Sequence, residues 1–469
     1  MAAQALALLS VAVLSFVQPH GAVAQELGQG PGRAGDAQTV TGADGQTTPQ
    51  TMVALAQAGR WAEAEALARR VLDTGPEDVA ALVVLARARR AAGDADGARA
   101  AAVRANDAAR DDSERYVAAV EMAAASHGQG RGLEAQFWMR RAAQMAPTVA
   151  SHDRALVDVQ RIGAAMPWKV ALQFNVSQSS NVNNGSLAES VDIGGLTFNL
   201  NPDAQALSGT EITAGVLARY RFAGAGGLPG QLTFNAATRQ VRLSDEARAK
   251  APAARSEDYA FGVLEVGVGQ ALTPADAALR FHLDGRLGKT WYGGEGLSRY
   301  MRLSGSADWG DPGTAVMAVV LSAERQLRLD DPAKTAWIAQ GDLHYRWRSG
   351  AGDTYVLSFG LRRTESRSVE VDNDAVIASA SWEKGHPLGG VASLGLGVSV
   401  EQRNYDASLY AAGARRDVVQ RASLRIGLPK VDYYGFSPIL SLESERLRSN
   451  VDFYDRSDVS FHLGLKTGF

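Results

Sequence analysis

The sequence contains no cysteine, and this absence excludes two kinds of site. Neither a disulfide framework nor a metal centre built on thiolate ligands can form. The chain also has no excess of positive charge, since 48 Lys and Arg stand against 51 Asp and Glu, a formal net charge of −3. Nucleic-acid-binding proteins present a basic face, so this balance argues against a nucleic-acid partner.

Motifs for catalysis and for nucleotide binding are missing as well. The seven histidines are scattered and form no HExxH pair, so a zinc enzyme is not expected. There is no GxxxxGK[ST] stretch to cradle a phosphate. No pair of carboxylates and no Ser/His/Asp set stands out from the other polar residues. We therefore expect no metal, no cofactor and no enzymatic activity.

Residues 1–24 are expected to be a secretory signal peptide. An apolar run leads into a stretch of small residues, and cleavage is expected between Ala24 and Gln25. The alternative is a membrane anchor, but the run is short and lacks flanking charge. Residues 25–49 are rich in Gly, Gln, Thr and Asp, and they are expected to form a disordered linker.

Residues 50–165 place apolar side chains at helical spacing and contain a repeat. Gly59 recurs as Gly93 and then as Gly128, at intervals of 34 and 35 residues, and an amphipathic stretch follows each glycine. A period near 34 residues is typical of tetratricopeptide repeats, which stack pairs of helices into an α-solenoid. We predict a periplasmic domain of about three such units with a capping helix. The alternative is a plain helical bundle.

Helical spacing ends near residue 166, and strict alternation of apolar and polar residues continues to residue 469. In "AWIAQGDLHYRWR", residues 336–348, Trp337 and Trp347 lie on one parity and Asp342 on the other. About fourteen such runs occur, and long alternating segments in even number are the signature of a transmembrane β-barrel. We predict a 14-stranded antiparallel outer-membrane β-barrel over residues 166–469. The alternative, a soluble β-sandwich, rarely needs strands of this length.

The connections between the runs are expected to alternate in length. Residues 178–209 form a long polar stretch, whereas "AGAGGLP" and "GDPG" read as tight turns. Outer-membrane barrels place short turns in the periplasm and long loops outside the cell. This rule places residues 1–167 and the end of the last strand on the periplasmic side of the outer membrane.

The polar parity of the runs predicts the side chains that line the lumen. A barrel of fourteen strands lies between filled eight-stranded barrels and open porins, so a polar passage of intermediate bore is expected. Charges of both signs face it, and they either pair across the lumen or contact a passing molecule. The predicted lumen-lining residues are Arg219, Arg221, Arg280, Asp284, Arg286, Asp342, Arg346, Arg403, Arg425 and Glu443.

Two stretches resemble a known family. "FNVSQSSNVNNGS", residues 174–186, is similar to its first barrel strand and the following loop. "GFSPILSLESERLRSNVDFYDRSDVSFHLGLKTGF", residues 435–469, is similar to its last hairpin. With the signal, linker, repeats and barrel, the chain resembles the surface lipoprotein assembly modulator (Slam) family, outer-membrane translocators of a type XI secretion pathway. The resemblance implies a final residue, Phe469, that serves as the signal for the barrel-assembly machinery.

The same two stretches supply the candidate substrate-binding residues, which are Asn181, Asn183, Asn184, Ser449 and Asn450. Asparagine and glycine also favour turns, so "NVNNGS" taken alone reads primarily as the start of a loop.

The sequence and its resemblance together suggest an outer-membrane translocator. Its expected partners are a client surface lipoprotein or secreted protein, the barrel-assembly machinery, a periplasmic chaperone and the lipids of the outer membrane. The helical repeats would receive the client, because solenoid surfaces bind extended segments. Two alternatives stay open: an exopolysaccharide exporter, which also joins such repeats to a barrel, and a passive porin anchored by its helical domain.

Overall fold

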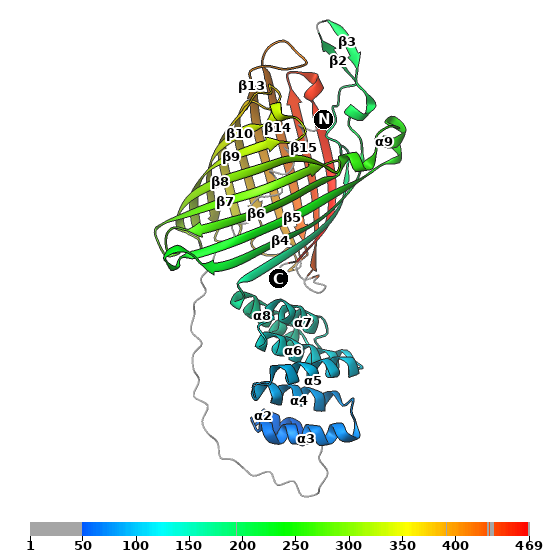
Figure 1. Cartoon of the computed structure of the whole chain (residues 1–469), viewed down its shortest axis with the longest axis vertical. Coiled ribbons are helices and arrows are strands. Elements are labelled where there is room, and N and C mark those ends of the chain that lie inside the picture. Colours follow the sequence, from blue (N-terminus) through cyan, green and yellow to red (C-terminus); the bar gives the residue numbers. More distant parts are fainter. Residues whose placement is uncertain (1–48, 194, 391, 429–430, 432–435, 468–469) are drawn as a thin grey trace. The chain divides into compact units, whose positions relative to one another are not determined.

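Two kinds of structure follow one another along the chain, as the change of sequence period predicts. The computed structural model describes residues 49–467, apart from residues 194, 391, 429–430 and 432–435. A helical unit extends to Met166, and a β-barrel unit begins at Pro167 (Figure 1). Within the described residues, no helix is both long enough and apolar enough to span a membrane.

The helical unit is a series of antiparallel helices, each packed against the next (Figure 1). Aspartates cap three of them: Asp78, Asp94 and Asp111 each accept a hydrogen bond from a backbone N–H of the first turn. Thr148 and Ser151 form a capping box at the start of the last one. The helices are α2 (Pro49–Gln57), α3 (Trp61–Thr74), α4 (Val79–Ala91), α5 (Ala95–Ala108), α6 (Asp112–Gly128), α7 (Gly132–Gln144) and α8 (Val149–Ala165).

Glycines with positive φ make the turns inside the helix pairs. They are Gly59, Gly93 and Gly130, with φ of 73°, 82° and 73°, a region that L side chains rarely adopt. The third turn therefore differs from the predicted one, because Gly128 is the last residue of α6 and Gly130 occupies the turn. The reason is length: α6 has 17 residues and α4 has 13, so the third turn comes later in its repeat.

Ion pairs join helices that are one repeat apart. Arg87 of α4 donates to Glu121 of α6 over 2.6 Å, and Arg99 of α5 donates to Glu134 of α7 over 2.8 Å. Buried alanines such as Ala64 lie between the helices, and their short side chains allow close helix contacts. The predicted α-solenoid is confirmed.

The barrel contains the predicted fourteen strands, all antiparallel to their neighbours. In spatial order β1 is followed by β16 and then by each strand in descending number to β4, which pairs with β1 and closes the ring. The strands are β1 (Trp168–Ser179), β4 (Gly209–Ala223), β5 (Pro229–Leu243), β6 (Phe261–Ala271), β7 (Leu279–Tyr292), β8 (Glu295–Asp311), β9 (Ala315–Arg328), β10 (Ala336–Arg348), β11 (Thr354–Ser366), β12 (Asn373–Glu383), β13 (Ser393–Tyr405), β14 (Arg415–Gly427), β15 (Phe436–Ser449) and β16 (Arg456–Thr467).

The alternation of the sequence becomes an apolar outer face and a polar inner face. On β16, Phe461, Leu463 and Leu465 expose 43 to 51% of their surface, while Ser460 is buried. A water-soluble protein rarely exposes so many large apolar side chains, and a barrel in lipid requires them. The closing strand pairs with β1 from Gln173↔Lys466 to Ser179↔Ser460, so its alternation reflects a place in the barrel wall.

We name the two ends of the barrel by their connections. The near rim, where β1 begins and β16 ends, carries residues 224–228, 272–278, 312–314, 349–353, 384–390, 392, 428 and 431 among the described residues. The far rim carries residues 180–208, 244–260, 293–294, 329–335, 367–372, 406–414 and 450–455.

The expected alternation of short and long connections is found only in part. The first two far-rim connections are long, but the third is only Gly293-Gly294, whose φ values of 58° and 84° suit a two-residue hairpin.

The far-rim loops contain elements that strand spacing did not predict. Residues 180–208 include a separate two-stranded sheet of β2 (Ser190–Ile193) and β3 (Leu196–Asn199), and the next loop contains α9 (Asp245–Lys250) (Figure 1). The end of the same loop, Ser256–Tyr259, forms a 3-10 helix, and strand β6 begins after it at Phe261.

Candidate functional site: the lumen and its two rims

Charged side chains on β6 to β8 form a connected network on the inner wall. Arg286 donates to Asp284 over 2.6 Å and to Glu265 over 3.1 Å, and the Tyr300 hydroxyl donates to the other oxygen of Glu265 over 2.7 Å. These groups come from three neighbouring strands, and the alternation turns all of them inward. Two further pairs lie on the same wall, Arg280 with Asp308 and Arg302 with Glu324, each at 2.6 Å.

A second network centres on Glu401 of β13. This carboxylate is 4% exposed, and it accepts hydrogen bonds from Arg403 over 2.7 and 3.0 Å and from Arg421 over 3.4 Å. Arg362 of β11 also donates to Glu401, and Arg421 donates a further hydrogen bond to Glu445 of β15. One carboxylate therefore connects strands β11, β13 and β14. Buried opposite charges of this kind stabilise the wall only while every partner is present, because removing one leaves the others buried and uncompensated.

Loops fold over the inner wall at the far rim beside this second network. The Arg415 guanidinium lies 3.6 Å from the ring centre of Tyr405 and 3.7 Å from that of Tyr454, and it pairs with the buried carboxylate of Asp417 at 3.0 Å. Tyr410 packs against Tyr454 at a ring separation of 5.8 Å. Burial raises the pKa of the Tyr454 hydroxyl. Two loops of the far rim are thus fixed to the barrel by aromatic and ionic contacts.

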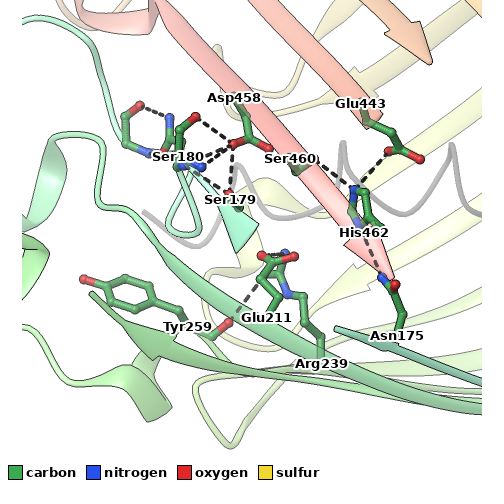
Figure 2. A network of polar contacts seen from close by, with 12 residues as sticks. Asn175, Ser179, Ser180, Glu211, Arg239, Tyr259, Glu443, Asp458, Ser460 and His462 are labelled. Carbon is green, nitrogen blue, oxygen red and sulfur yellow. Dashed lines mark hydrogen bonds and ion pairs between the residues drawn. The ribbon is translucent and has the colours of Figure 1, made fainter. Parts of the chain in front are cut away.

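Asp458 of β16 fastens the first loop to the closing strand (Figure 2). Its Oδ1 accepts hydrogen bonds from the hydroxyl of Ser179, from the backbone N–H and hydroxyl of Ser180, and from the backbone N–H of Asn181, at 2.9 to 3.1 Å. The Ser180 hydroxyl in turn accepts from the backbone N–H of Val459. The loop that follows β1 is therefore held where the barrel closes.

The predicted residues Asn181, Asn183 and Asn184 form the frame of this loop. The Asn181 amide is 4% exposed and donates to Gly185 and Ser457 carbonyls, while its oxygen accepts from the Gly185 N–H.

Asn183 spans the loop. It donates to the carbonyls of Asp203 and Gln205 and accepts from the Leu207 N–H over 2.9 Å. Asn184 has a positive φ of 53°. The side-chain contacts of Asn181 and Asn183 are with the backbone of the loop and, for Asn181, also with Ser457 at the start of β16, and contact with a substrate stays a prediction.

Ser449 and Asn450 occupy the equivalent place at the end of β15. Asn450 accepts from the Arg416 N–H over 2.7 Å and donates to the Ala414 carbonyl over 2.9 Å. The Ser449 hydroxyl accepts from the Val451 N–H. Asn450 therefore joins two loops of the far rim and Ser449 supports the loop that follows it, and their role toward a substrate likewise stays a prediction.

The predicted lumen residues differ in the partners that they contact. Arg280, Asp284, Arg286 and Arg403 belong to the networks above. Two others have weaker contacts: Asp342 accepts from Gln340, and Glu443 lies 3.8 Å from His462. Within the described part of the chain, three have no carboxylate within ion-pair distance: Arg219, Arg346 and Arg425. Arg221 lies beside Arg219 on the same face of β4, at the near rim.

Three predicted positions lie outside the described residues: Ala24 and Gln25 at the signal cleavage site, and the terminal Phe469. The described residues contain no group of three or more His, Asp or Glu side chains arranged to hold a metal ion. Sequence reasoning missed Asp458 and Arg415 as residues that organise the far rim. Asp458 shares the polar parity of Ser460, which was the available signal, whereas Arg415 is the first residue of β14, where the alternation only begins.

Comparison with known proteins gives a match in each unit. Residues 55–123 match the tetratricopeptide repeat family. Residues 343–469 match the family described as surface lipoprotein assembly modifier. The expected resemblance is confirmed over these residues. This second match covers β11 to β16 and the end of β10, the part of the barrel that carries the Glu401 network and Asp458.

Solved structures resemble the two units separately. The Acinetobacter baumannii protein OccAB3 is 8% identical, with a TM-score of 0.36, over 64% of this chain and 99% of its own. A bacterial polysaccharide outer membrane secretin is 9% identical, with a TM-score of 0.34, over 64% and 98%.

The Yersinia enterocolitica type III secretion translocator chaperone SycD is 15% identical, with a TM-score of 0.23, over 25% of this chain and 81% of its own. At such scores these likenesses carry no functional argument. A search of curated proteins found no match.

The location follows from the fold and the family together. The chain forms a closed 14-stranded barrel with an apolar outer face, and it matches a family of surface lipoprotein assembly proteins. It is an outer-membrane protein with an N-terminal helical domain, and the family that its C-terminal part matches is described as acting in surface lipoprotein assembly.

Proposed function

We propose that this protein moves a client polypeptide, lipidated or secreted, across the outer membrane. The observation that carries the proposal is the family match over residues 343–469. The polar inner wall supports it, because a charged, hydrogen-bonding passage suits an extended polypeptide better than it suits lipid. The proposal assigns no catalytic step to the chain.

The helical domain receives the client in this account. Its repeats form a solenoid, and solenoid surfaces bind extended segments. The helical domain is joined to β1 at the near rim, since α8 ends at Ala165 and β1 begins at Trp168. The near rim is accordingly the periplasmic one, and the far rim with its ordered loops faces the outside. Chaperone and barrel-assembly partners belong to the same proposal.

Surface display of a client in intact cells tests this function. A lipoprotein or small secreted protein encoded beside this chain is co-expressed with the full protein, without it, or with a variant that lacks residues 50–165. Antibody binding and external protease then report the client at the surface. We expect display only with the full protein, and a folded barrel without display for the shortened variant.

Other results would favour the other functions. A passive porin would admit small solutes in both forms and leave client exposure unchanged. A polysaccharide exporter would change the amount of surface polymer and not that of the client. Equal display in cells that lack the protein contradicts the proposal.

A further inference from the structure

The inner wall is strongly basic close to the near rim. Among the described side chains within five strand residues of this rim, seven inward-facing Lys and Arg stand against two carboxylates. One carboxylate, Asp308, is already bound to Arg280. The cations are Lys169, Arg219, Arg221, Arg280, Arg346, Arg348 and Arg425, and the carboxylates are Asp308 and Glu383.

Like charges stand directly opposite each other in this region. Lys169 of β1 and Arg219 of β4 are register partners on neighbouring strands, and such a pair destabilises a sheet. Along the same row Arg219 is followed by Thr233 and Gly267, two short residues, and then by Arg286. The Arg219 and Arg286 charges repel each other across this gap.

A third repulsive pair lies on β10. Arg346 and Arg348 are two residues apart and face the same side of the strand, and their charges also repel.

The other half of the lumen shows the opposite arrangement. There Glu265, Glu324, Glu401 and Asp417 each pair with an arginine within 3.1 Å. These four carboxylates of the far half are therefore neutralised by arginines on the wall, whereas Lys169, Arg219, Arg346, Arg348 and Arg425 have no carboxylate within ion-pair distance in the described part of the chain. Cations that are kept together at a cost to the fold are suited to a negatively charged ligand that arrives from outside.

We propose that the near rim of the lumen binds an acidic segment of the client polypeptide as the client enters the barrel. This inference rests on the proposed function and adds the chemistry of recognition. Carboxylates of an extended segment pair with successive guanidinium groups around the rim. An anionic polysaccharide presents carboxylates too, but the match to the lipoprotein assembly family favours a polypeptide.

Binding of a fluorescein-labelled poly-glutamate peptide to the purified full-length protein, followed by fluorescence anisotropy, tests the proposal. The first variant combines Arg219→Gln, Arg346→Gln, Arg348→Gln and Arg425→Gln, and a second has Lys at the same four positions. A matched control removes four outward-facing arginines of the far rim: Arg242→Gln, Arg299→Gln, Arg325→Gln and Arg446→Gln. Poly-lysine and oligogalacturonate serve as competing probes.

The four inward glutamines are expected to raise the Kd of poly-glutamate at least about fourfold, because each partly exposed ion pair contributes roughly 1.4- to 5-fold. The lysine variant and the matched control are expected to stay within about twofold of the unchanged protein. Unchanged binding in the inward glutamine variant would overturn the proposal. So would binding of oligogalacturonate without poly-glutamate, which points to a polysaccharide.

Surface display separates this inference from the proposed function. We expect the inward glutamine variant to form a heat-modifiable barrel and to display less client. If the inward glutamine variant binds poly-glutamate weakly but displays the client fully, the inference is overturned and the proposed function stays in place. Absence of display with the unchanged protein rejects the proposed function, whatever the peptide measurement shows.

Discussion

Glu401 offers the sharpest test of how the inner wall is held together. Its carboxylate accepts hydrogen bonds from Arg403, Arg421 and Arg362, and its side chain is 5% exposed. The change Glu401→Gln keeps the size and removes the charge. It leaves three arginines with little access to water, of which only Arg421 retains another carboxylate, Glu445.

The expected loss follows from this burial. Breaking a buried ion pair by removing one partner costs about 3–5 kcal/mol, because the remaining charge is left uncompensated. Glu443→Gln is the matched control on β15. Its carboxylate is 44% exposed on the side chain and lies 3.8 Å from His462, so its loss should cost less than about 1 kcal/mol.

Urea unfolding of the purified barrel in lipid vesicles measures both changes, with the heat-modifiable band on a gel as the readout. We expect the Glu401→Gln midpoint to fall far below that of Glu443→Gln. Added salt should change the stability loss of Glu401→Gln only slightly, because buried ion pairs are little screened. Equal midpoints for the two variants would refute the claim that Glu401 organises this wall.

Four further predictions concern Asp458 of the closing strand, the helical domain (two of the four) and the terminus. Asp458→Ala removes the acceptor of four hydrogen bonds, so external protease should cut the 180–208 loop faster while the barrel stays heat-modifiable; an unchanged cleavage rate speaks against the fastening role. A fragment of residues 50–165 should be soluble and helical by circular dichroism, because each repeat buries its apolar face on the next, and a sheet-like spectrum counts against the solenoid. In that fragment the hydrogen bond from Arg99 lowers the pKa of Glu134. The ionised Glu134 therefore stabilises the fragment above its unfolded pKa, and this stabilisation is lost as the pH falls through its folded pKa. The Arg99→Ala fragment should lose less stability over that pH range. Deleting Phe469 should lower the amount of heat-modifiable barrel, and full folding with lost client display would contradict its role in assembly.

The barrel wall was predictable because contact with lipid requires an apolar outer face on every strand. A strand between lipid and a polar lumen must alternate, so the shared parity of Trp337, Leu343 and Trp347 is enough to mark the outer face of β10. The same alternation predicted that Arg280, Arg286 and Arg403 face the lumen. It could not tell which inward charges pair, because pairing depends on the register of neighbouring strands, and a shift of one residue changes every neighbour.

The far rim was harder to predict because its contacts join distant parts of the chain. The first-loop asparagines were recognised as unusual, but nothing local indicates that Asn183 spans the loop to reach Leu207. Asp458 binds residues 277 to 279 positions away, a separation that periodicity cannot reveal. The shift of the third repeat turn from Gly128 to Gly130 has a simpler cause, since both glycines can end a helix and only the length of α6 decides between them.

Translocation by purified components tests the central claim most directly. The full-length protein is inserted into liposomes that enclose the unfolded candidate client, and external protease and antibody report the client that reaches the outside. We predict client outside only in liposomes that carry the full protein, with the amount reduced when residues 50–165 are missing. Intact liposomes that carry the folded full protein and retain all the client, while small solutes pass freely, would contradict the account.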